Sequence, residues 1–209
     1  VFENLGNGVF QDATEAWGFS QEPAFSLNAT ILDFTGDGLQ DVFVGNDSMA
    51  NNLFVNTGET PTRFEDKGLH TGVAANGDGS MQATMGIAIA DVNGNKRPDV
   101  FTTNFSSDTN TLHTNDTSGY FDDRTKRFGL GIMSRMHLGW SCGFHDFDLD
   151  GDEDLFIVNG HVYPEATLDT MDSPREQTVL LFERVGDRFI QIEQEYAYRD
   201  RAAVFGDLD

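Results

Sequence analysis

A nine-residue acidic segment recurs along the chain and constrains its fold more than any other feature. In the clearest copy, residues 146–154, carboxylates stand at the first, third, fifth and ninth positions and glycine at the sixth. Oxygens at alternate positions of a tight turn suit a hard cation such as Ca²⁺, which takes six to eight oxygens at about 2.3–2.6 Å. Without a cation, carboxylates this close repel one another. The segment therefore predicts a calcium-binding turn rather than an ordinary acidic surface loop.

Further copies of the segment give the chain a repeat. Residues 33–41 and 91–99 share its frame, and residues 207–209 match its first three positions. The copies begin at Asp33, Asp91, Asp146 and Asp207, which are 58, 55 and 61 residues apart. A period of this length indicates a repeat architecture. We expect Ca²⁺ in three complete loops, with a fourth loop truncated.

Each complete acidic segment lies between two runs that are typical of β-strands. Small and apolar residues precede it, and a β-type run ending in asparagine follows it (Asn46, Asn104 and Asn159). Two more such runs come next, separated by the Gly, Asn and Asp residues that hairpin turns favour. Phenylalanines recur at matching strand positions, where we expect packing between repeats: Phe54, Phe64, Phe101, Phe121, Phe156 and Phe182. One repeat thus predicts four antiparallel strands, as in a propeller blade.

The expected fold class is all-β, a single β-propeller segment over residues 1–209 with about three and a half four-stranded antiparallel blades. The expected blades are residues 1–12 (last two strands), 27–66, 84–123, 137–192 and 201–209 (first strand only). Because the last motif is cut in half and Val1 is not an initiator methionine, we interpret the chain as a fragment of a larger ring. Half-blades leave strand edges unpaired, so we expect self-association through the terminal edges. The connecting segments 67–83 and 164–178 are expected to be exposed loops.

The composition excludes several classes of protein. There are 13 basic against 35 acidic residues, a net charge of −22, which argues against binding nucleic acid or an anionic membrane. No run is long enough for membrane insertion, and 18 Phe in regular apolar runs argue against disorder. Cys142 is the only cysteine, so an intrachain disulfide is impossible; we expect a small buried strand residue there.

Short motifs around the loops carry a resemblance to a known family. They are Met-Gly-Ile-Ala at 85–88, Thr-Asn-Phe-Ser at 103–106, Leu-Gly-Trp at 138–140 and Asn-Gly-His-Val-Tyr-Pro at 159–164. With the acidic loops, they make the chain resemble the FG-GAP/VCBS repeats of integrin-α-like propellers. The narrower resemblance is to the repeat region of the ASPIC/UnbV (cartilage acidic protein-like) family. It implies a propeller, usually seven-bladed, with calcium in the blade hairpins, in a secreted or surface-exposed protein.

The resemblance also implies a ligand set for each loop: four side chains and the carbonyl of the seventh residue. The implied ligands are Asp33, Thr35, Asp37, Leu39 and Asp41; Asp91, Asn93, Asn95, Arg97 and Asp99; and Asp146, Asp148, Asp150, Asp152 and Asp154. Thr35 departs from the family's preference for Asp or Asn, and the second loop has only two carboxylates. Because ligand charge tunes calcium affinity, we expect the third loop to bind most tightly and the second most weakly, with calcium in a structural role.

Three functions fit these features, in descending order. The first is an extracellular scaffold for adhesion, or for binding an unknown protein or glycan ligand, without catalysis, since the nucleophile-elbow, zinc-protease and phosphate-loop signatures do not occur. The second is part of a calcium-dependent propeller lyase or hydrolase acting on polysaccharide. The third is a dockerin-like module, which would need an acidic residue at the twelfth loop position and a helix after it.

Some remaining motifs have both a functional and a structural interpretation. His161 and Tyr163 could form a ligand-contacting loop, but a turn with packing between blades is favoured. Four Asn-x-Ser/Thr sites occur, at Asn28, Asn46, Asn104 and Asn115. Asn46 and Asn104 hold equivalent repeat positions, so turn chemistry explains them without a glycan.

Overall fold

The computed structural model of the chain describes residues 1–19, 23–162, 173 and 176–192. The regular secondary structure of that part is almost entirely β, with fourteen strands and one four-residue helix. The elements are β1 (Phe2–Gly6), β2 (Val9–Asp12), β3 (Ser26–Leu32), β4 (Asp41–Asn46), β5 (Asn52–Asn56), β6 (Phe64–Asp66), α1 (Gly68–Thr71), β7 (Ile87–Ala90), β8 (Asp99–Thr102), β9 (Thr111–Asn115), β10 (Phe121–Asp123), β11 (Gly139–His145), β12 (Asp154–Asn159), β13 (Leu180–Val185) and β14 (Arg188–Ile192). No helix among the described residues has the length and apolar character to cross a bilayer.

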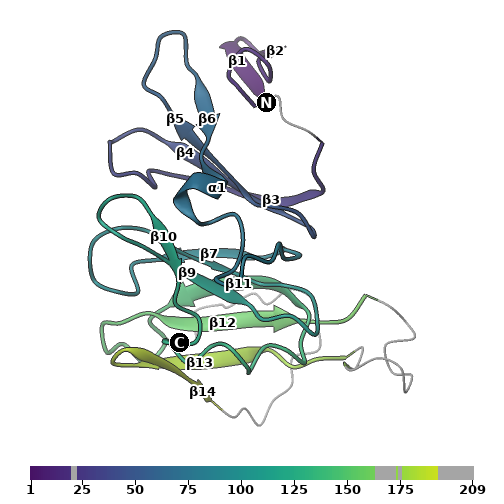
Figure 1. Cartoon of the computed structure of the whole chain (residues 1–209), viewed down its shortest axis with the longest axis vertical. Coiled ribbons are helices and arrows are strands. Elements are labelled where there is room, and N and C mark those ends of the chain that lie inside the picture. Colours follow the sequence, from purple (N-terminus) through teal and green to yellow (C-terminus); the bar gives the residue numbers. More distant parts are fainter. Residues whose placement is uncertain (20–22, 163–172, 174–175, 193–209) are drawn as a thin grey trace.

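The strands form three four-stranded antiparallel sheets and one two-stranded pair. In each larger sheet the strands are hydrogen-bonded in chain order: β3 to β6, β7 to β10 and β11 to β14, while β1 pairs with β2. Figure 1 shows the sheets following one another in the same order along the long axis, with the β1–β2 hairpin beyond the first sheet. The predicted fold class, all-β with four-stranded antiparallel blades, is confirmed. The strand expected at 201–209 lies outside the described residues.

The acidic segment has the same place in all three large sheets, between the first and second strands. Its ninth residue opens the second strand and pairs with the residue that precedes the segment. The three pairs are Leu32–Asp41, Ala90–Asp99 and His145–Asp154. Because the period-2 alternation is then fixed across the hairpin, every sheet presents equivalent residues to its neighbours.

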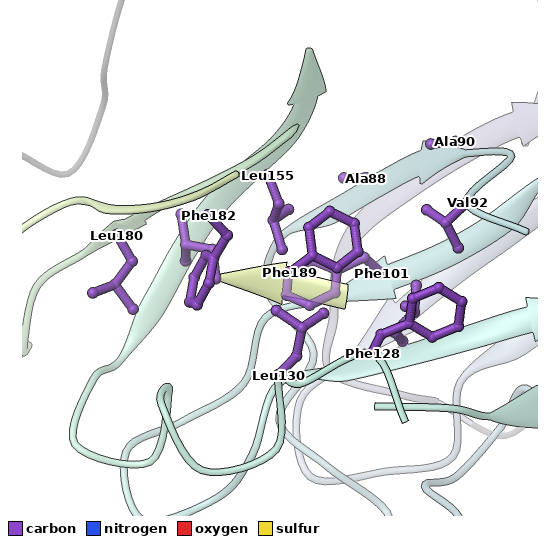
Figure 2. Close-up of a cluster of buried hydrophobic side chains, with 12 residues drawn as sticks. Ala88, Ala90, Val92, Phe101, Phe128, Leu130, Leu155, Leu180, Phe182 and Phe189 are labelled. Atoms are coloured by element: carbon purple, nitrogen blue, oxygen red, sulfur yellow. The ribbon is translucent and has the colours of Figure 1, made fainter. Parts of the chain in front are cut away.

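Apolar side chains fill the space between successive sheets. Between the first two sheets the buried cluster is Phe34, Phe43, Leu53, Val73, Val100 and Phe121. Between the second and third, Figure 2 shows Phe101 with Ala88, Ala90 and Val92 facing Leu155, Leu180, Phe182 and Phe189. Phe128 and Leu130, from the segment after β10, also belong to that cluster, as do Leu112 and Ile157. The expected packing of repeated phenylalanines is confirmed for Phe101, Phe121 and Phe182, so the sheets are held together mainly by buried apolar area.

Glycines allow the first strands of neighbouring sheets to approach closely. A Cβ atom on Gly139 would lie 2.6 Å from the Cβ atom of Thr103, and one on Gly86 would lie 2.7 Å from the Thr103 Oγ1 atom. Thr103 follows β8 and bonds to both glycines: Gly86 N–H donates to Thr103 Oγ1 at 2.8 Å, and that hydroxyl donates to the Gly139 carbonyl at 2.8 Å. The small residues before the acidic loops therefore serve inter-sheet packing.

One connecting segment differs from its prediction. Residues 67–83 were expected to form an exposed loop, but they contain α1 and six buried residues: Gly68, Thr71, Val73, Ala74, Gln82 and Ala83. Val73 is 0% exposed because it packs into the cluster between the first and second sheets. The prediction was wrong because the glycine and polar residues around Val73 are typical of a loop, although the short apolar pair Val73 and Ala74 packs into the core. Most of 164–178 lies outside the described residues.

Candidate metal centre

The third loop wraps its backbone around its own carboxylates. Asp146 accepts hydrogen bonds from the N–H groups of Asp150 at 3.1 Å and Gly151 at 3.0 Å. Asp148 also accepts from the Asp150 N–H, at 3.2 Å, and Asp150 in turn accepts from that of Asp152, at 3.0 Å. Gly151 has a φ of +96°, a conformation that glycine adopts without steric cost. The chain therefore bends sharply at this glycine.

Three acidic side chains converge in the third loop. One carboxylate oxygen from each of Asp146, Asp148 and Asp154 lies within 4.8 Å of the other two. Two oxygens bound to one Ca²⁺ can be separated by at most about 5 Å, twice the Ca–O distance, so this spacing fits the ion. Asp152 Oδ1, in the same loop, is buried without a hydrogen-bond partner among the described residues. The donor set is hard oxygen throughout, which matches calcium chemistry.

The electrostatics of the third loop also favour a cation. Loss of hydration, followed by repulsion from Asp150, Asp154 and Asp146, raises the pKa of Asp148. Loss of hydration and the charge of Asp150 likewise raise the pKa of Asp152. The positive charge of the nearby Arg184 offsets part of this rise. A divalent cation would relieve this repulsion and lower the pKa of both carboxyl groups again.

The ninth residue of each loop is buried and ties the loop to the third strand of its own sheet. Asp154 accepts from Phe147 N–H at 3.0 Å and from Arg184 N–H, in β13, at 2.8 Å. The equivalent bonds join Asp41 to Phe34 and Asn56, and Asp99 to Val92 and Asn115. Each carboxylate oxygen has a second lone pair, so this bonding leaves room for a cation. These hydrogen bonds also give the ninth aspartate a structural role that the sequence did not reveal.

The first loop has the same backbone geometry with fewer converging acids. Asp33 accepts from the N–H groups of Gly36 at 2.5 Å, Asp37 at 3.2 Å and Gly38 at 2.8 Å. Asp37 accepts from Leu39 N–H at 2.8 Å, and Thr35 Oγ1 lies 3.5 Å from Asp33. Among the described residues, only the third loop brings three acidic side chains to metal-binding distance. The first loop would have to tighten around an ion.

The second loop is held by amide hydrogen bonds. Asp91 accepts from the N–H groups of Asn95 at 3.0 Å and Lys96 at 2.6 Å. The Asn93 amide donates to Asp99 at 3.2 Å, and the Asn95 amide donates to the Asn115 carbonyl at 2.7 Å. These N–H donors lie beside the carboxylate and amide oxygens that a cation would need as ligands. Burial raises the pKa of Asp99 to about 7, so a proton also competes for this carboxylate.

Arg97, at the seventh position of the second loop, reaches into the first loop. Its guanidinium donates to the Thr35 carbonyl at 3.1 Å. It covers Gly36 so closely that a Cβ atom there would lie 1.0 Å from Arg97 Nη1. The side chain of a residue predicted to supply only its carbonyl therefore contacts the neighbouring sheet.

Residues of the other sequence motifs have structural contacts. Asn46 and Asn104 are 0% exposed and bond to their own turns: Asn46 Nδ2 donates to the Ala50 carbonyl at 2.6 Å and Asn104 Nδ2 to the Thr109 carbonyl at 2.8 Å. Turn chemistry for these two asparagines is confirmed. His161 is buried with its Nε2 atom 3.3 Å from Ser106 Oγ, whereas Tyr163 lies outside the described residues. Cys142, in β11, is half-buried rather than fully buried as expected, and loss of hydration raises the pKa of its thiol, which disfavours the reactive thiolate.

The repeated sheet with an acidic turn between its first two strands defines the class of protein. It is a β-propeller repeat protein. More narrowly, the chain belongs to the FG-GAP-like repeat family, whose model matches residues 33–102 and 91–157. Both matches begin at the first aspartate of an acidic loop. No curated protein matches the chain, and the narrower likeness to ASPIC/UnbV repeats stays a prediction.

Proposed function

We propose that the chain is a calcium-stabilised β-propeller scaffold in a secreted or surface-exposed protein. The observation that carries this proposal is the convergence of Asp146, Asp148 and Asp154 within 4.8 Å in the hairpin that joins β11 to β12. A cation there would fix the two strands that pack against the second sheet. Modules that work in extracellular calcium bind it with dissociation constants near 10⁻⁴–10⁻³ M, a range that suits a partly solvated loop.

The scaffold would present its surface to a protein or glycan, with calcium as a structural ion and no catalytic step. The alternative, a calcium-dependent lyase or hydrolase, makes a different prediction, because it would turn over acidic polysaccharide at a rate that depends on calcium. Measurable turnover by the purified chain would contradict the non-catalytic proposal.

Calorimetric titration with CaCl₂ tests the metal site directly. The wild-type chain should bind Ca²⁺ with a Kd on the order of 10⁻⁴–10⁻³ M, and Asp148→Asn should weaken the tightest site about tenfold or more, because it removes one converging charge. Asp187→Asn is the matched control, since Asp187 lies in the β13–β14 turn with its side chain 82% exposed. Absence of binding to the wild type, or equal binding by both variants, would overturn the proposal.

A further inference from the structure

In the second and third sheets, the third strand connects the sheet's own acidic loop with the loop of the preceding sheet. The backbone N–H of Asn115 donates to Asp99 at 2.7 Å, while its side-chain amide donates to the Phe34 carbonyl at 2.8 Å. Arg184 repeats this arrangement one sheet later. Its backbone N–H donates to Asp154 at 2.8 Å, and its guanidinium donates to the Val92 carbonyl at 2.6 Å.

The acceptors of these two side chains are equivalent residues. Phe34 and Val92 each hold the second position of an acidic loop, and the N–H of each donates to the ninth aspartate of that loop. Phe34 N–H lies 3.0 Å from Asp41, and Val92 N–H lies 2.9 Å from Asp99. Hydrogen bonds on both flanks therefore fix each second-position residue.

Together these bonds form a continuous path across three sheets. It runs through Asp154, Arg184, Val92, Asp99, Asn115, Phe34 and Asp41. Apart from Arg184, which is half-buried, the path is buried: Asp41 and Asp99 are 0% exposed, Asn115 is 1% and Val92 is 3%. Water cannot replace a broken bond in such surroundings without cost, so a shift at one end is resisted along the path.

The Arg184 side chain is held in place by more than its bond to Val92. Its guanidinium carbon lies 5.3 Å from the centre of the Phe128 ring and 5.1 Å from that of Phe189, distances at which cations and aromatic rings attract. Its Nε atom donates to the Gly186 carbonyl at 2.5 Å. The side chain also lines the hollow between the second and third loops, together with Asp91 and Asp152. It is therefore a rigid, positively charged link between two acidic loops.

We propose that Asn115 and Arg184 are positioning residues that couple the acidic loops, so that a divalent cation bound in the third loop also orders the second and first loops. This inference rests on the proposed calcium function. A cation fixes Asp154, Asp154 fixes the backbone of Arg184, and the guanidinium transmits that order to Val92 and Asp99. The second loop, with two carboxylates and its own amide bonds, would then be stabilised from its neighbour rather than by an ion of its own.

Amide hydrogen exchange of the full chain, with and without Ca²⁺, tests the coupling. In the wild type, calcium should slow exchange in the third loop and also, roughly fivefold or more, at the amides of Val92 and Asn115. Arg184→Met keeps the packed stem and the backbone bond to Asp154, so protection of the third loop should persist while the effect at Val92 falls below about twofold. Arg188→Met, which removes the same charge from the adjacent strand, should behave as the wild type.

A second variant keeps the test independent of how Arg184→Met folds. Asp148→Asn weakens only the third-loop site, so calcium should lose its effect on Val92 and Asn115 as well. If calcium still protects these amides fully in Asp148→Asn or in folded Arg184→Met, the loops respond separately and the coupling is wrong, although calcium binding stands. If titration detects no calcium bound to the wild type, the proposed function itself fails and the coupling fails with it.

Discussion

At the scale of single residues, the ninth-position aspartates have two roles that sequence cannot separate. Asp41 is fully buried and accepts three backbone N–H bonds, from Phe34 at 3.0 Å, Thr35 at 3.2 Å and Asn56 at 2.9 Å. Burial raises the pKa of Asp41, and these three bonds offset part of that rise. The residue would therefore support the fold even where no cation is bound.

Replacing Asp41 should destabilise the chain in the absence of calcium. Asp41→Ala leaves buried N–H groups without acceptors, at a cost of about 1–3 kcal/mol for each group, so we expect the free energy of unfolding to fall by about 3 kcal/mol or more. Asp37→Ala, in the same loop but exposed, should cost less than about 1 kcal/mol. Urea unfolding in chelator measures both, and equal losses would refute the structural role.

His113 stands where the other two large sheets have phenylalanine. Val100 pairs with His113 in the second sheet as Val42 pairs with Phe54 in the first. His113 is 2% exposed, its Nε2 atom lies 2.9 Å from the Ala75 carbonyl, and burial lowers its pKa despite the charges of Asp123 and Asp122. The folded chain therefore keeps this imidazole neutral.

The buried imidazole should make stability depend on pH. Because the folded state binds the proton less readily than the unfolded state, His113 supports folding above the unfolded pKa of about 6.5 and this support is lost as pH falls below it. His113→Phe should flatten the loss of unfolding free energy between about pH 6.5 and pH 5. His145→Phe, at an exposed position, is the control; an unchanged pH profile in His113→Phe would contradict the assignment.

At the scale of secondary-structure elements, close approach of the first strands determines which residues they tolerate. β7 lies next to both β3 and β11. A Cβ atom on Gly86 would meet Thr103 Oγ1 at 2.7 Å, the Trp140 carbonyl at 3.1 Å and Cys142 Sγ at 3.2 Å. The run of small residues before each acidic loop thus reflects how closely the neighbouring sheet approaches.

A single methyl group at this contact should destabilise the stack of sheets. Gly86→Ala crowds the Thr103 hydroxyl, the Trp140 carbonyl and the Cys142 sulfur, and overpacking of this kind typically costs about 1–3 kcal/mol. At Gly131 the added methyl would meet only Lys126, at 3.3 Å from the Cγ atom of its flexible side chain and at an ordinary 3.8 Å from its Cα atom, so Gly131→Ala should be close to neutral. Thermal unfolding of the two variants distinguishes them, and equal melting temperatures would argue against tight packing at Gly86.

At the scale of the whole molecule, the β1–β2 hairpin presents apolar surface to solvent. Phe2 is 68% exposed and Phe10 is 61% exposed, and the register places them on one face of the pair. Both edges of this pair are free of other strands among the described residues. Exposed apolar side chains beside free strand edges favour association with another chain.

Self-association through this hairpin should therefore depend on concentration. Light scattering of the purified chain should detect a species larger than the monomer at high protein concentration, and Phe10→Ser should reduce it. Tyr120→Ser removes a comparably large exposed aromatic from the turn just before β10 and should leave association unchanged. A monomer at all concentrations would show that the hairpin does not drive association.

The amino-acid sequence by itself determined the repeat, the four-strand unit and the acidic hairpin, because each depends on local spacing: two residues per strand alternation, nine residues per turn. It could not determine that Asp41, Asp99 and Asp154 fasten their loops to the third strand, or that Asn115 and Arg184 reach the loop of the preceding sheet. Those partners are 15 to 92 residues apart. Strand pairing within a sheet brings the first set of partners together and the stacking of the sheets brings the second, since hydrogen bonds between distant segments depend on distances in space that local patterns do not encode.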